Sequence, residues 1–197
     1  MTLVRYAHKA PFALDAIGFD IADDIAEPHI NRVPFSGVLS RVDEASTRPP
    51  NGSEGHKVFI PREVAEKALP TLIGMGIDVD TDFKDHATTR KIGVITEAHI
   101  EGKDLVISGH MYAKDFPGEV AYIKKHKSIL GASYEIADVQ VRDTSSPIWE
   151  LESFVFTGAA ILKKNAAAYQ STSIAASMQS LETADDLFAH PEIAAEL

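Results

Sequence analysis

The fold is decided by a hairpin of two apolar segments in the middle of the chain. The hairpin reads KIGVITEAHI from Lys91 to Ile100, EGKD from Glu101 to Asp104, and LVISGHMY from Leu105 to Tyr112. The outer segments are rich in β-branched and aliphatic residues, and the four residues between them have the glycine and charged side chains of a turn. We therefore predict two antiparallel strands joined by a tight turn.

The segments on either side of this hairpin predict further strands and a few helices. The pattern from Phe35 to Asp43 alternates as a strand does, and Pro61–Leu69 has the pattern of a helix with proline at its first position. After the hairpin we expect a helix that opens at Pro117, strands over Ala132–Val141 and Ile148–Phe156, and an Ala- and Ser-rich helix from about Ala159 to Met178. Several antiparallel strands with few helices predict an α+β fold.

Composition changes along the chain and divides it into three parts. We expect an N-terminal extension over residues 1–32, a β-rich domain over residues 33–165, and a helical and acidic C-terminal tail over residues 166–197. The last stretch, Leu181–Leu197, carries five acidic residues and no Lys or Arg. Such charge asymmetry is typical of an appendage rather than of a core.

Overall composition excludes several classes of protein. Of the 197 residues, 45% are hydrophobic and 24% charged, as in a globular protein with an ordinary core. The chain has no cysteine, which excludes disulfides, thiolate metal sites and cysteine nucleophiles. A net charge of −10 argues against a general nucleic-acid binder. Because no run approaches the roughly 20 apolar residues of a membrane helix and no secretory signal is visible, we expect a soluble protein made in a cytoplasm.

Two positions carry residue types suited to covalent chemistry. His86 follows Asp85 in a polar segment before the hairpin, and histidine accepts and returns a proton near neutral pH. Ser133 follows a glycine and an alanine, whose small side chains leave its hydroxyl accessible. Each signal alone is weak, because most loop histidines are solvated and a serine after glycine usually bonds locally. Glu135 excludes the Gly-x-Ser-x-Gly elbow of the α/β-hydrolases.

The order of these motifs resembles that of the tailed-phage prohead proteases. Asp85-His86 followed by Lys91–Ile95 is similar to the histidine motif of that family, and Leu130–Glu135 is similar to its motif of a glycine, a small residue and a serine. Trp149–Val155, where acidic residues precede an apolar stretch, resembles its late strand. The resemblance covers about residues 34–165.

The resemblance implies a serine endopeptidase with the fold of the herpesvirus assemblins, which is a β-barrel flanked by helices. Such a protease is packed inside the assembling procapsid, in the cytoplasm of the host bacterium. There it cleaves scaffold and capsid-protein extensions, and itself. The expected partners are therefore phage scaffold and major capsid protein as substrates, with no nucleic acid, membrane, metal or cofactor, and with homo-oligomerisation left open. The small residues Ala175–Ser177 mark a candidate region for self-cleavage.

Carried over to this chain, the roles of the family fall on residues that match its motifs. The resemblance makes Ser133 the nucleophile and His86 the general base. Glu152, on a strand after the nucleophile, is the expected third member, because a carboxylate there would fix the histidine tautomer. Glu150 points to the same side of a regular strand and is one reserve candidate; Asp138 is another.

Gly158 and Ala159 occupy the place of the assemblin turn that donates N–H groups to the oxyanion, so we expect the oxyanion hole there. The basic residues usual in that turn are missing. Two other functions stay open: a catalytically silent scaffold or assembly protein on the same fold, and a β-rich binding domain whose motif order is coincidental. The presence of both His86 and Ser133 favours the enzyme.

Overall fold

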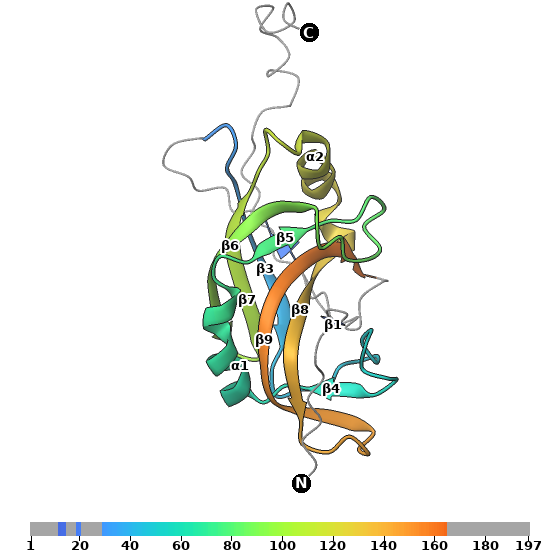
Figure 1. Cartoon of the computed structure of the whole chain (residues 1–197). Helices are drawn as coiled ribbons and strands as arrows, with labels where there is room; N and C mark the ends of the chain where they lie inside the picture. Colours follow the sequence, from blue (N-terminus) through green and yellow to red (C-terminus); the bar gives the residue numbers. More distant parts are fainter. Residues whose placement is uncertain (1–11, 15–18, 21–28, 165–197) are drawn as a thin grey trace, which may run out of the picture.

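The computed structural model describes residues 12–14, 19–20 and 29–164. Within these residues the chain forms a nine-stranded mixed sheet that curves into a half-barrel (Figure 1). In chain order the strands are β1 (Phe12–Leu14), β2 (Phe19–Asp20), β3 (Val33–Arg41), β4 (Lys57–Phe59), β5 (Gly76–Asp78), β6 (Lys91–Glu101), β7 (Asp104–Met111), β8 (Leu130–Val141) and β9 (Ile148–Lys163).

The sheet has the order β1-β8-β9-β5-β6-β7-β3-β2, and β4 pairs with β9 outside this path. The predicted hairpin forms as β6 and β7, paired from Glu101 and Asp104 at the turn to Gly93 and Met111. Most neighbouring strands are antiparallel, whereas β9 pairs in parallel with both β4 and β5. The α+β fold class is confirmed.

In the described residues, two short α-helices accompany the sheet. The helix α1 (Arg62–Ala68) begins directly after Pro61 and buries Val64, Ala65 and Ala68. The 3-10 turn η1 (Leu69–Leu72) continues it. The helix α2 (Pro117–His126) begins at its proline, as predicted, and is followed by η2 (Lys127–Ile129). Figure 1 shows α1 beside β9 and α2 at one end of the curved sheet. In the part of the chain that the structure describes, no helix is long and apolar enough to cross a membrane.

The predicted helix from Ala159 is wrong where it can be compared with the structure. Residues 159–163 continue β9, which lies between β8 and β5 at this point. Ala159 and Ile161 pack in the main core, and Ala160 and Leu162 form a second cluster. Alternation between two covered faces outweighs the helix preference of alanine. The remainder of the predicted helix and the tail, including Ala175–Ser177, lie outside the described residues.

Several strands were not predicted because they are short. β4 and β5 have three residues each, too few to show an alternating pattern. β1 pairs with Tyr134–Ile136 of β8, and β2 pairs with Ser36 and Gly37 of β3. Parts of the predicted N-terminal extension therefore add strands to the sheet.

The middle of β8 is covered on both faces, so polar side chains on this strand are also buried. Ala132, Tyr134 and Ile136 point into the main core. Ser133 and Glu135 point to the opposite face, yet each residue is only 3% exposed. The segment of residues 79–90, between β5 and β6, closes over this second face.

Candidate active site

Four polar or small residues stand in a row across four adjacent strands. Ser133 of β8 pairs with Ala160 of β9, Ala160 pairs with Asp78 of β5, and Asp78 pairs with Lys91 of β6. Directly paired residues in a sheet project to the same face. The pairing therefore brings a hydroxyl, a carboxylate and an ammonium group to one face of the sheet. The methyl group of Ala160 lies between the hydroxyl and the carboxylate.

A second row contributes the acid of the site. Glu135 lies two residues after Ser133 on β8 and shares its face, because side chains alternate along a strand. Its partner on β9 is Gly158. A Cβ built on this glycine would lie 2.6 Å from Oε2 of Glu135, so only glycine leaves the carboxylate its position.

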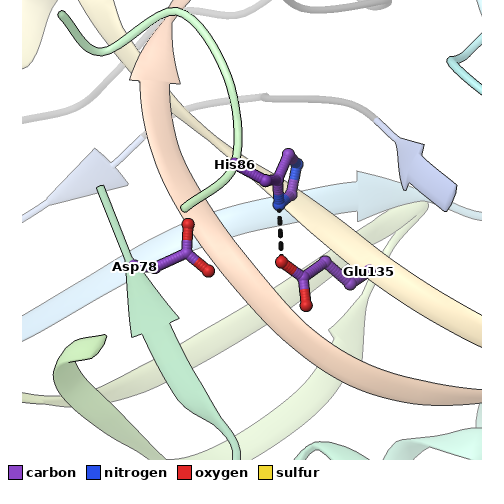
Figure 2. Close-up of side chains that lie close together, drawn as sticks. All are labelled: Asp78, His86 and Glu135. Carbon is purple, nitrogen blue, oxygen red and sulfur yellow. Dashed lines mark hydrogen bonds and ion pairs between the residues drawn. The ribbon is translucent and has the colours of Figure 1, made fainter. Parts of the chain in front are cut away.

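His86 joins the serine to the glutamate. Its Nε2 lies 2.9 Å from Oγ of Ser133, and its Nδ1 lies 2.9 Å from Oε1 of Glu135. Figure 2 shows the imidazole above Glu135, with Asp78 on the other side of the β9 ribbon. An ionised carboxylate only accepts hydrogen bonds, so Nδ1 carries the proton and Nε2 is free to accept from the serine hydroxyl. This chain of hydrogen bonds is the arrangement of a Ser-His-acid triad.

Contacts at both ends of the segment hold the histidine in place. Phe83 stacks on Tyr122 of α2 with ring centroids 4.7 Å apart, and its carbonyl accepts the N–H of Lys163 at 2.7 Å. After the histidine, the N–H of Ala87 donates to Oδ1 of Asp78 at 2.9 Å. The histidine side chain is only 6% exposed. The base is thus presented by an anchored segment.

Two buried carboxyl groups near the histidine have pKa values shifted in opposite directions. Burial raises the pKa of Asp78, against the opposing effects of Lys91 and the N–H of Ala87. Burial also acts to raise the pKa of Glu135, but the hydrogen bond from His86 and the charge of Lys91 outweigh it, and that pKa is lowered. Glu135 is therefore anionic at neutral pH, which a partner for a histidine N–H requires.

Donor atoms of Asp78, His86 and Glu135 lie within 4.8 Å of one another, a spacing that also suits a metal ion. In this structure the position beside the two carboxylates is taken by Lys91. Its Nζ lies 2.6 Å from Oδ2 of Asp78 and 3.8 Å from Oε2 of Glu135. The cluster therefore already contains its own cation.

The structure brings Ser133 and His86 together, as the resemblance implied, but gives the third position to Glu135. Glu152 instead faces Arg142, with 3.4 Å between Oε1 and Nε. It precedes Gly158 by six residues on β9, a separation of about 20 Å at the rise of a strand. The assignment of Glu152 is therefore corrected. The signal that identifies Glu135 is its i+2 spacing from the serine.

Both reserve candidates for the acid are also placed elsewhere. Glu150 pairs with Arg142 at 2.5 Å, near the far end of the β8–β9 hairpin. Asp138 is exposed and has a φ of 52°, at an irregularity where the pairing of β8 with β9 shifts register. Neither side chain contacts His86, whose ring nitrogens already have partners.

Gly158 and Ala159 have a different position from the one predicted. Ala159 is fully buried and pairs with Tyr134 on one side and Ile77 on the other. Backbone N–H groups in such a strand lie in the plane of the sheet, while the hydroxyl of Ser133 stands above it. The structure therefore does not bring these N–H groups together with the hydroxyl of Ser133. Gly158 instead leaves room for the charged ends of Glu135 and Lys91.

The role of this glycine predicts the effect of Gly158→Ala. The new methyl group would lie 2.6 Å from Oε2 of Glu135 and 3.1 Å from Nζ of Lys91, both ends of flexible side chains. These ends can move, so we expect the melting temperature to stay within about 4 °C of wild type, the effect of roughly 1 kcal/mol. The displaced acid should lower any triad-dependent activity by about 100-fold.

The matched control is Gly118→Ala on α2, where an added Cβ meets nothing within 4 Å. Thermal unfolding and reaction with a serine-directed probe should be measured on both variants. A Gly158→Ala protein with unchanged reactivity would show that the reactivity of Ser133 does not depend on the position of Glu135.

Comparisons with known proteins agree with the sheet architecture. The chain is similar to the solved structure of the bacteriophage T4 capsid assembly protease, gp21, with a TM-score of 0.52. The similarity covers 79% of this chain and 99% of that one, at 14% sequence identity, so it shows a shared fold. No match is found among curated proteins. Residues 50–194, well over half of the chain, match the family model described as the YonD N-terminal domain, and the chain therefore belongs to that family.

Proposed function

We propose that this protein is a serine endopeptidase that acts in the maturation of a phage capsid. The observation that carries the proposal is the continuous path of hydrogen bonds from Ser133 through His86 to Glu135, with both links at 2.9 Å. A buried serine, histidine and carboxylate in this order are the groups that acyl transfer needs. Ser133 and Glu135 lie buried on one face of β8, and the segment between β5 and β6 holds His86 against both of them.

The reaction assigns one step to each side chain. Nε2 of His86 takes the proton as Oγ of Ser133 attacks the peptide carbonyl, and the same proton then passes to the leaving amine. A water molecule, activated by His86, hydrolyses the acyl-serine and restores the hydroxyl. Glu135 keeps the proton on Nδ1 and stabilises the imidazolium that forms during each step.

The proposed substrate class is based on the fold neighbour. The similar structure is that of a capsid assembly protease, so we propose scaffold and capsid-protein extensions, and the chain itself, as substrates. The work would then take place inside the assembling procapsid in the bacterial cytoplasm. No cofactor enters this reaction, because the proton transfers and the nucleophile are all supplied by side chains.

A fluorophosphonate probe tests the proposal directly, because it reacts with activated serines whatever the peptide specificity. We expect the wild-type chain to gain the mass of one probe molecule, and the Ser133→Ala variant to gain none. Cleavage of co-expressed scaffold, followed by mass spectrometry, should show the same difference. An unlabelled wild-type protein that still supports shell assembly would instead indicate a catalytically silent scaffold on this fold.

A further inference from the structure

Lys91 reaches the site by an unusual path across the sheet. It begins β6, yet its ammonium group lies beside the glutamate of β8. A Cβ on Gly76 would lie 2.7 Å from both Cγ and Cδ of this lysine, and a Cβ on Gly158 would lie 3.1 Å from its Nζ. The absence of a side chain at both glycines thus leaves room for the lysine side chain, whose ammonium group lies between Asp78 and Glu135.

Asp78 links this cation to the backbone of the base. Its side chain is fully buried; Oδ2 accepts a hydrogen bond from Nζ of Lys91 at 2.6 Å, and Oδ1 accepts one from the N–H of Ala87 at 2.9 Å. Ala87 directly follows His86. One carboxylate therefore holds both the lysine beside the acid and the chain beside the base.

We propose that Lys91 and Asp78 form a positioning pair for the Ser-His-Glu site: Lys91 holds Oε2 of Glu135 so that Oε1 faces His86, and Asp78 fixes Lys91 and the backbone after His86. The inference rests on the proposed function, because it concerns the same site. Both residues act through the acid and the base rather than on the substrate.

Among the residues that the structure describes, the charged or titratable groups that act on Glu135 are Asp78, Lys91 and His86, which gives the pair a definite electrostatic effect. Asp78 comes from β5, Lys91 from β6 and His86 from the segment between them, while the facing residues of β9, Gly158 and Ala160, carry no charge. The positive charge of Lys91 opposes addition of a proton to the His86–Glu135 couple. The negative charge of Asp78 favours it.

Substitutions at the two positions should therefore move the acid limb of the pH profile in opposite directions. In Lys91→Met the couple binds its proton more tightly, so activity should be lost at a higher pH than in wild type. In Asp78→Asn the negative charge that partly offsets Lys91 is gone, so the His86–Glu135 couple binds its proton less tightly. The acid limb should therefore move to lower pH. Each shift should be about half a pH unit or more, as expected for charges a few ångströms away that partly offset each other.

Two further variants separate charge from structure. Lys91→Arg keeps the charge and the aliphatic part of the side chain that packs beside the two glycines. The acid limb of its pH profile should therefore stay near that of wild type. Lys84→Met removes a nearby lysine whose side chain is 64% exposed and pairs with Asp82. Water screens such a charge, so this control should leave the limb in place.

Two measurements are needed on each variant: the pH profile of kcat/KM for scaffold cleavage, and the titration of the His86 imidazole by NMR. The NMR titration needs no turnover, so it tests the pair even if the wild-type chain does not cleave, in which case only the proposed function fails. Shifts of equal sign in Lys91→Met and Asp78→Asn, or none in either, would overturn the inference. If Lys91→Met does not fold, the other two variants test the inference. It then requires that the acid limb move to lower pH in Asp78→Asn and stay in place in Lys91→Arg.

Discussion

The His86→Ala variant is expected to lose about four or more orders of magnitude in kcat/KM for scaffold cleavage. Without the imidazole, the hydroxyl of Ser133 has no group to take its proton, and a neutral serine is a weak nucleophile at pH 7. The buried position of the ring, 6% exposed, also means that solvent does not readily substitute for it. Cleavage rates should be measured on purified wild-type and variant protein with the same scaffold substrate.

The double variant His86→Ala/Ser133→Ala sharpens this test. Residues that act as a unit lose nearly all of their effect with the first substitution, so the double variant should be no slower than Ser133→Ala alone. The matched control is His99→Ala, at an exposed position of β6, which should cleave at the wild-type rate. Multiplicative losses in the double variant would mean that the two residues do not work in one step.

The Glu135→Gln variant is expected to lose between about two and four orders of magnitude in kcat/KM. A glutamine amide can donate its N–H to Nδ1, which places the imidazole proton on Nε2. A protonated Nε2 can no longer accept the proton of the serine hydroxyl. It also removes the negative charge that stabilises the imidazolium. The NMR signals of the His86 ring nitrogens should report this change of tautomer.

The comparison variant is Glu152→Gln, which has nearly the same volume change but lies away from the site. Its partner Arg142 has a side chain that is 56% exposed, so the lost ion pair is screened by water and the cleavage rate should change by less than about twofold. A larger loss in Glu152→Gln than in Glu135→Gln would return the third position to Glu152.

The central hairpin and the serine–histidine pair were accessible from the sequence because each has a local signal. β-branched runs on both sides of a glycine-containing turn indicate β6 and β7. Ser133 and His86 lie in short motifs with a recognisable order. Glu135 also had a local signal, since alternation along one strand places residues two apart on one face. The choice of Glu152 rested instead on the resemblance of Trp149–Val155 to the late strand of the family.

The remaining parts of the site depend on pairing that no local pattern encodes. Asp78 belongs to a strand of three residues, and its neighbour on β9 is Ala160, more than eighty residues away in the chain. Lys91 looks like an ordinary strand end until Gly76 and Gly158 are seen to make room for it. The error at Ala159 has the same origin, because one of the two strands that flank this alanine-rich segment is β5, more than eighty residues earlier in the chain.

The hydrogen bond between the carbonyl of Phe83 and the N–H of Lys163 has a consequence for timing during translation. Ribosomes make the histidine segment before the serine strand, and the last strand comes later still. Until residue 163 has left the exit tunnel, β8 lacks its full partner and the histidine segment lacks this anchor. The proposed Ser-His-Glu site is therefore complete only after the last strand of the sheet has been made and has paired with β8.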